Sequence, residues 1–177
     1  HQVTNLQEES VREVPLKAKD GSIVWLEQTV KLIVQDGQFF KAIVVARDIS
    51  IQRQEREKHE AERARLNLLI DNMPQAILLE DEHRKIIKVN DEFCNLFNIP
   101  AKPYMLVGAD CSKSAEESKH LFENSDDFEN KIEITLKNRE LVTKQYLKMT
   151  NGMVLLRDCI PINKDNIYLG HMWVYHD

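Results

Sequence analysis

The sequence predicts an α+β fold, in which an antiparallel sheet carries helices on one face. Two observations support this prediction: apolar runs separated by tight-turn pairs, and a repeat of that arrangement within the chain. The repeated segments, residues 19–48 and 150–177, each contain a turn pair, an apolar strand, a polar turn, a second apolar strand and a final aspartate. The second copy is preceded by about half a domain, residues 69–142, whereas the first has only residues 11–18 before its turn. We therefore expect one complete module that follows a partial, three-stranded sheet of another.

The first segment is predicted to form a three-stranded antiparallel meander rich in Val, Ile, Trp and Phe. The pairs Asp20-Gly21 and Asp36-Gly37 separate its strands, and an Asp-Gly pair favours the two-residue turn of a hairpin. Such a sheet needs cover for its apolar face and its edges. We therefore expect the natural protein to continue upstream of His1. The expected strands cover residues 11–18, 22–34 and 38–46.

A charged stretch over residues 51–65, IQRQEREKHEAERAR, is predicted to form a connecting helix, because it contains neither Gly nor Pro. Opposite charges stand four residues apart, as in Arg53 and Glu57, and each such pair adds about 0.2–0.5 kcal/mol to helix stability. Asp48 and Ser50 are suitable N-cap residues. The helix is either a solvated linker or a parallel coiled coil in a dimer. Polar residues occupy positions that would face the partner helix in a coiled coil, so both interpretations remain open.

The third segment begins with a predicted hairpin over residues 75–80 and 84–89, followed by a short helix that Asn90 caps. Phe93 and Phe97 lie on the apolar face of this helix, and two prolines end it.

Two further helices and three strands are expected after this. Ser112 or Ser114 can cap the first helix, and Asp126 or Asp127 can cap the second. Residues 128–138 fit both a strand and a helix, and their charged residues favour the helix. The last strands repeat the meander of the first segment. They cover residues 143–149, 153–162 and 167–176.

Residues 72–100, NMPQAILLEDEHRKIIKVNDEFCNLFNIP, resemble the start of a PAS sensor domain. That family places a proline before the first strand, an acidic turn before the second and an asparagine at the start of the first helix. Here these are Pro74, Asp81 and Asn90. Residues 46–50, ARDIS, are similar to the Asp-Ile-Thr motif that ends a PAS domain and begins a connecting helix. The resemblance implies three junction residues that would relay a signal: Asp48, Ser50 and Asp177.

The resemblance also implies a five-stranded antiparallel sheet whose helices form one wall of a pocket. It implies a cytoplasmic signalling protein, commonly a sensor histidine kinase or a diguanylate cyclase with several PAS domains in tandem. The chain would then contain the last strands of an upstream PAS domain (1–48), a connecting signalling helix (49–70) and a complete PAS domain (71–177). We expect a non-catalytic sensory module that binds a small molecule or a partner and relays its state through helical linkers. It would form a homodimer through the linker helix and a sheet face. The alternative is a PAS domain that serves only as a dimerisation scaffold.

Asp158 is a candidate pocket residue, because it lies on the same face of its predicted strand as Leu156 and Ile160 and so interrupts an apolar face. Glu27 occupies the same position of the first copy. A cross-strand ion pair or a solvent-facing position would also explain this carboxylate, since a buried unpaired charge is costly. If the strand faces the other way, Arg157 would meet an anionic ligand instead. The candidate pocket residues are Phe93, Phe97, Tyr146, Leu156, Asp158 and Trp173.

Cofactor chemistry is not expected. Light-sensing flavin PAS domains carry a reactive cysteine in a Gly-x-Asn-Cys-Arg-Phe-Leu-Gln motif, and here only Gly108 and Cys111 fit. Tyr175 stands where a flavin-contacting glutamine is expected. His120 lies where haem-binding PAS proteins place their iron ligand, but its neighbours differ from that subfamily. We predict no cofactor, no metal and no catalytic residue, because metal-ligand spacings, glycine-rich phosphate loops and a nucleophile with a base are not found.

Composition excludes several classes of partner. The net charge of −5, without a basic stripe, argues against a nucleic-acid binder. Three cysteines without a CxxC pair argue against a disulfide framework or a zinc site. Because no apolar run approaches the length of about 18 residues that suggests a membrane span, we expect no membrane contact.

Overall fold

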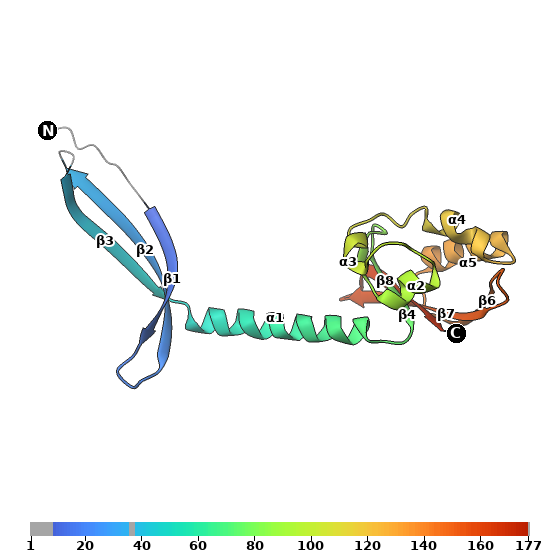
Figure 1. The fold of residues 1–177 in the computed structure, drawn as a ribbon, viewed down its shortest axis with the longest axis horizontal. Helices are drawn as coiled ribbons and strands as arrows, with labels where there is room; N and C mark the ends of the chain where they lie inside the picture. Colours follow the sequence, from blue (N-terminus) through green and yellow to red (C-terminus); the bar gives the residue numbers. More distant parts are fainter. Residues whose placement is uncertain (1–8, 36–37, 177) are drawn as a thin grey trace. The chain divides into compact units, whose positions relative to one another are not determined.

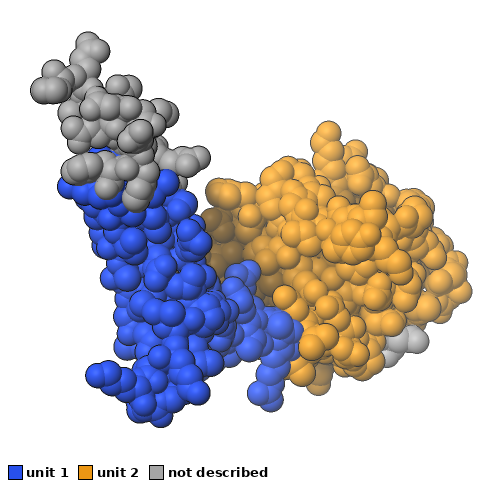
Figure 2. Space-filling model, turned by 60° about the vertical axis from the view of Figure 1, so that its left-hand side comes forward, with its two compact units in different colours: residues 1–65 blue, residues 66–177 orange. Residues whose placement is uncertain are grey.

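The computed structural model describes residues 9–35 and 38–176, within two compact units, residues 1–65 and 66–177 (Figure 2). The first unit contains a three-stranded sheet and the second a five-stranded sheet with helices (Figure 1). The predicted α+β fold, with a helix between the two sheets, is therefore confirmed. Two predicted features lie outside the described residues: the Asp36-Gly37 turn and the junction residue Asp177.

The sheet of the first unit is an antiparallel meander in the order β1-β2-β3. The predicted turn at Asp20-Gly21 joins the first two strands. Gly21 has a φ of 90°, which glycine adopts without strain, and its N–H donates to the Ala18 carbonyl at 3.0 Å. The elements of this part of the chain are β1 (Glu9–Lys17), β2 (Ile23–Gln35), β3 (Gln38–Asp48) and the following helix α1 (Ser50–Asp71).

The first turn of α1 is tied to the three-stranded sheet. The Asp48 carboxylate accepts a hydrogen bond from the Ser50 N–H at 2.9 Å, and the Ser50 hydroxyl accepts one from the Trp25 N–H at 2.9 Å. The Arg53 guanidinium lies 3.7 Å from the centre of the Trp25 ring and pairs with Glu13 at 3.1 Å. These contacts fix where the helix begins.

The second unit is built on an antiparallel sheet in the order β5-β4-β8-β7-β6, with its helices on one face (Figure 1). The strands are β4 (Ala76–Asp81), β5 (Ile86–Val89), β6 (Val142–Lys148), β7 (Val154–Lys164) and β8 (Ile167–His176). The helical segments are α2 (Asp91–Leu96), α3 (Pro103–Leu106), α4 (Ser114–Ser118), the 3-10 turn η1 (Lys119–Leu121) and α5 (Ser125–Asn138).

Asn90 is buried with 0% exposure and joins three elements. Its side-chain oxygen accepts hydrogen bonds from the Ile77 N–H in β4 at 2.9 Å and from the Phe93 N–H in α2 at 3.1 Å. Its side-chain nitrogen donates to the Gln75 carbonyl at 2.8 Å and to the Ile70 carbonyl, in the last turn of α1, at 3.2 Å. The predicted N-cap of α2 is confirmed, and the same amide also holds the end of α1.

Two helix starts differ from the sequence prediction. The Asn124 side chain, rather than Asp126 or Asp127, caps α5 by accepting from the Asp127 N–H at 3.1 Å. The predicted helix over residues 128–138 is confirmed. The N-cap position of α4 is Lys113, whose side chain makes no capping hydrogen bond, and the α-helix ends after 5 residues. The single helix expected there is thus divided into α4 and η1.

The register of β7 places Leu155, Arg157 and Cys159 on the buried face of the sheet, under the helices. Leu156 and Asp158 therefore face the opposite side. The face of the strand that carries Asp158, which was predicted to line the pocket, is therefore the face turned away from the helices. Both faces of the strand carry apolar residues, so its own pattern does not decide which face is buried. Pairing with β8 decides it, because Arg157 and Cys159 lie opposite the buried residues Tyr175 and Trp173.

The strands β8 and β4 approach one another closely at Gly170. This residue has a φ of 130°, and a Cβ placed on it would lie 2.0 Å from the Glu80 carbonyl oxygen. Any side chain at this position would therefore push the two central strands apart.

Candidate functional site

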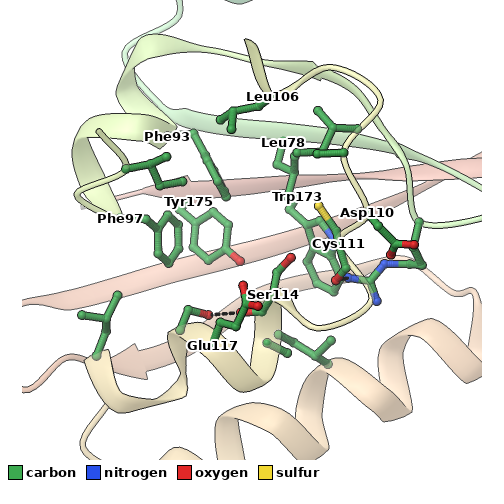
Figure 3. Close-up of a pocket in the computed structure, with 18 of the residues that line it drawn as sticks. Leu78, Phe93, Phe97, Leu106, Asp110, Cys111, Ser114, Glu117, Trp173 and Tyr175 are labelled. Atoms are coloured by element: carbon green, nitrogen blue, oxygen red, sulfur yellow. Dashed lines mark hydrogen bonds between the residues drawn. The ribbon is translucent and has the colours of Figure 1, made fainter. Parts of the chain in front are cut away.

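A cavity of about 670 Å³ lies between the five-stranded sheet and the helices of the second unit (Figure 3). Strands β4, β5 and β8 provide one side, and α2, α3, α4 and α5 contribute to the other. The lining is mostly apolar and aromatic. Its principal apolar residues are Leu78, Ile86, Phe93, Phe97, Ile99, Leu106, Phe128, Ile132, Trp173 and Tyr175.

Aromatic rings form one end of the cavity. The Phe93 and Phe97 rings lie 4.6 Å apart, and Phe97 packs edge-on against Tyr175 at 5.2 Å between ring centres. Phe122 and Phe128 stack at 3.9 Å behind them. The spacing of Phe93 and Phe97 on α2, which Asn90 caps, brings these side chains together over β8.

The segment formed by α4 and η1 makes the wall opposite β8. None of its residues is buried, and its side chains bond mainly within the segment. The Ser118 hydroxyl donates to the Ser114 carbonyl at 2.6 Å, and the His120 ring lies 2.9 Å from the Glu117 carbonyl oxygen. Segments with few buried contacts open at low free-energy cost, so this wall, like α3, can move more readily than the strands of the sheet.

A buried polar network lies beside the cavity. The His171 ring nitrogen is 3.1 Å from the Glu80 carboxylate, and Tyr168 hydrogen-bonds the other ring nitrogen at 2.6 Å. Arg84 pairs with the same carboxylate and donates to the Cys111 carbonyl at 2.8 Å. Sequence reasoning missed this network. The sequence did contain a signal for it: Glu80 alternates with Ala76 and Leu78 on one face of its strand, which places a carboxylate on the buried face.

Arg157 is the second buried charge near the cavity. Its Nε donates to the Gln145 side-chain oxygen at 2.9 Å, and its guanidinium lies 4.9 Å from the Trp173 ring centre and 5.3 Å from that of Phe128. Phe128 and Trp173 both line the cavity, so the guanidinium lies directly behind its wall.

The predicted pocket residues separate into two groups. Phe93, Phe97 and Trp173 line the cavity, whereas Tyr146, Leu156 and Asp158 do not.

Tyr146 is 68% exposed, and Asp158 lies on the outer face of the sheet. There the Asp158 carboxylate accepts from the Lys144 N–H at 2.7 Å and lies 3.2 Å from a ring nitrogen of His176. Lys144 has a φ of 55° in a bulge of β6, so Asp158 stabilises an irregular strand edge. The junction residues Asp48 and Ser50 belong to the first unit.

The two residues considered for cofactor attachment have no activating surroundings. Burial, followed by the nearby Glu80 carboxylate, raises the pKa of the Cys111 thiol to about 11, so the thiol stays protonated and is a poor nucleophile. His120 is exposed. Among the described residues, no group of His, Cys, Asp and Glu side chains has an arrangement that would hold a metal ion.

A five-stranded antiparallel sheet with helices over a central cavity defines the second unit as an α+β domain. Residues 64–134 match the sequence model of the PAS domain. These residues therefore belong to a PAS domain, a module that is sensory or signalling in many regulators and is generally non-catalytic.

Solved structures resemble the chain at low sequence identity. The DhaR(N)–DhaL complex of E. coli has a TM-score of 0.54 at 10% identity, covering 86% of this chain and 55% of that one, which shows the fold alone. The PAS domain of an HTR-like protein from Haloarcula marismortui gives 0.43 at 16% identity, covering 71% and 98% of the two chains. The PAS domain of BvgS from Bordetella pertussis gives 0.48 at 17%, covering 66% and 86%.

A comparison with curated proteins gave no match. Within the described part of the chain, no helix is both long and apolar enough to cross a membrane.

Proposed function

We propose that residues 71–177 form a non-catalytic sensory PAS domain that binds a small molecule in the cavity and relays its occupancy through helical linkers. The output domain would be one such as a histidine kinase, in a cytoplasmic signalling protein. The cavity carries this proposal. Its volume of about 670 Å³ and its apolar, aromatic lining suit a small-molecule site, since such sites usually span about 300–1,000 Å³.

The contacts of Asn90 support a route from the cavity to the preceding helix. The Asn90 amide bonds both the Phe93 N–H, in a residue that lines the cavity, and the Ile70 carbonyl at the end of α1. A ligand that moves α2 would therefore move the last turn of α1. Such a ligand must bind two states of the domain with different affinity, because only differential binding shifts an equilibrium.

Recovery of a bound molecule tests ligand binding. The purified chain is denatured, and the released small molecules are identified by mass spectrometry. We expect one compound to be recovered reproducibly from the parent chain and lost from Ala115→Phe, which fills the cavity from α4. Ala64→Phe, on the exposed middle of α1, is the matched control and should retain the compound. If neither recovery nor a thermal-shift screen of metabolites identifies a ligand, the scaffold alternative is favoured.

We also propose the domain division 1–48, 49–70 and 71–177, with the first part formed by the last three strands of an upstream PAS domain. Its support is the matching register of the two copies: Lys17 pairs with Ile23 before the first hairpin, as Lys148 pairs with Val154 in the second. In this arrangement, Asp48 and Ser50 relay the state of the upstream domain into α1, and Asp177 occupies the corresponding junction after the second.

A homodimer through α1 and a sheet face is the third part of the proposal. Leu66, Leu68 and Leu69 are exposed near the end of α1, and exposed apolar side chains in such a group favour association. Light scattering at high protein concentration should give the mass of a dimer, and Leu66→Glu combined with Leu69→Glu should give a monomer. Arg63→Glu, on the same helix, is the control. A monomeric parent chain at high concentration would exclude the coiled-coil interpretation.

A further inference from the structure

Arg157 carries a buried positive charge that no acid compensates among the residues that the structure describes. Its side chain is 1% exposed, and its Nη1 atom is buried without a hydrogen-bond partner. The other guanidinium nitrogens bond the neutral amide of Gln145. Trp173 and Phe128 supply only ring faces. A buried charge without an ionic partner is costly, so an occupant that supplies a negative charge would stabilise this arrangement.

The other charged groups at the cavity differ from Arg157. Arg84 is paired with Glu80, and Asp110 is paired with Lys85 at 2.8 Å. Glu117 is exposed on α4 and so remains hydrated. His171 has a buried ring nitrogen without a hydrogen bond, but that nitrogen lies 3.1 Å from the Glu80 carboxylate. Arg157 differs from it in having a buried donor, Nη1, and no carboxylate in an ion pair with it.

Tyr175 connects Arg157 to the cavity. Arg157 of β7 lies directly opposite Tyr175 of β8 in the strand register, which places both side chains on the same face of the sheet. Tyr175 lines the cavity, and Figure 3 shows its hydroxyl directed toward the segment that carries Ser114 and Glu117. Burial raises the pKa of Tyr175, while Arg157 acts in the opposite direction. The hydroxyl is consequently protonated at neutral pH and is available to donate a hydrogen bond to a molecule in the cavity.

We propose that the ligand of this cavity is a small carboxylate with an apolar body, whose carboxylate accepts a hydrogen bond from Tyr175 and is compensated in charge by Arg157. The apolar body lies among Phe93, Phe97 and Leu106, where the lining offers hydrophobic contact. This inference rests on the proposed ligand-binding function and adds the chemical class of the ligand.

Matched pairs of acids and amides test the proposal by isothermal titration with the full 177-residue chain. The probes are 3-phenylpropanoate against 3-phenylpropanamide, and octanoate against octanamide. We expect each acid to bind about tenfold more tightly than its amide, as a charge-assisted hydrogen bond would give. Tyr175→Phe and Arg157→Gln should each remove most of this preference and leave the affinity for the amides unchanged. Tyr168→Phe, which removes a hydroxyl outside the cavity lining, should keep the preference.

Each outcome bears on a different part of the argument. Equal binding of acids and amides by the parent chain would overturn the carboxylate proposal and leave the ligand-binding function standing. A preference that survives in Tyr175→Phe would overturn the assignment, and this variant remains informative if Arg157→Gln does not fold. If no probe binds and no compound is released on denaturation, both the proposed function and this inference fail.

Discussion

Leu16 and Leu147 occupy the same position in the two units and have different surroundings. Each leucine lies in the strand before the hairpin turn, and each pairs with the second residue of the next strand, Val24 in one unit and Leu155 in the other. Leu16 is 47% exposed, whereas Leu147 is 4% exposed. Similar strands in the same register therefore have different burial, because only the second unit provides helices over the sheet among the residues described.

The sequence of the strands determines how they pair, whereas the elements packed over the sheet determine how much of it is buried. Turn pairs and alternation produce the meander in both units. Burial, and with it most of the stability, depends on the layer above the sheet. In the first unit, Ile49 is the buried apolar residue of the described part, and it lies at the junction with α1 rather than on the strands.

The largest expected effect is the difference between truncations at the two leucines. We expect Leu147→Ala to lower the free energy of unfolding of the second unit by about 2–5 kcal/mol, because it leaves a cavity in a packed core. Leu16→Ala should cost the first unit less than about 1 kcal/mol, because the side chain is already half exposed. Urea unfolding followed by fluorescence reports the two units separately when each is measured with the other unit's tryptophan, Trp173 or Trp25, replaced by Phe. Equal losses at both positions would mean that the first sheet is covered in solution.

The next largest effect concerns Asn90, whose amide hydrogen-bonds five backbone groups in the second unit. Asn90→Ala should lower the free energy of unfolding by about 3 kcal/mol, since it removes a helix cap and leaves buried donors and acceptors unpaired. Asn95→Ala on the same helix, where the side chain is exposed, should change it by less than about 0.5 kcal/mol. Both values are measured by urea unfolding at neutral pH. Similar losses of stability in the two variants would contradict the role of Asn90 in linking α1, β4 and α2.

A smaller effect is expected where α1 meets the first sheet. Arg53 contacts the Trp25 ring and pairs with Glu13 and Glu57, and all these groups are partly exposed. Arg53→Gln should cost about 1 kcal/mol, since exposed cation–π and ion pairs contribute little. The measurement is urea unfolding of the first unit followed by Trp25 fluorescence, with Arg63→Gln as the control. A loss that persists unchanged in high salt would indicate that packing on Trp25, rather than charge, provides the contact.

The smallest expected effect is a pH dependence at Asp110. Hydrogen bonds from Lys85 and Ser112 hold the pKa of this carboxyl below its usual value. An unfolded aspartate has a pKa of about 3.9, so the stabilisation is complete above that value and is lost as the pH falls toward the folded pKa. Below about pH 4, the parent chain should therefore lose stability more steeply than Asp110→Asn. Urea midpoints across this range test the difference, with Glu133→Gln as the control, and parallel slopes would contradict it.

The sequence predicted the order of the elements well, because local signals determine it. The Asp20-Gly21 turn, the Asn90 cap and the apolar spacing of Phe93 and Phe97 act over a few residues, and each has the predicted structure. Phe93 and Phe97 both line the cavity, because their spacing on α2 directs them to the same face of that helix.

Sequence reasoning failed where pairing across the sheet decides the outcome. Asp158 was assigned to the pocket from the parity of one strand, and a single strand does not reveal which face the helices cover. Glu80 and His171 lie 91 positions apart in sequence (171 − 80), so only the pairing of β4 with β8 brings them together. The position of Tyr175 beside Arg157 likewise follows from the register of β7 and β8, which neither strand reveals alone.

The close approach of β8 to β4 at Gly170 has a genetic consequence. Gly170→Ala would add one methyl group against the Glu80 backbone and disrupt the sheet, although it alters no side chain that lines the cavity. It would thus serve as a loss-of-structure allele in the natural protein. A phenotype shared by Gly170→Ala and Tyr175→Phe would then report loss of the input, and a phenotype found only with Gly170→Ala would report loss of the domain as a mechanical support.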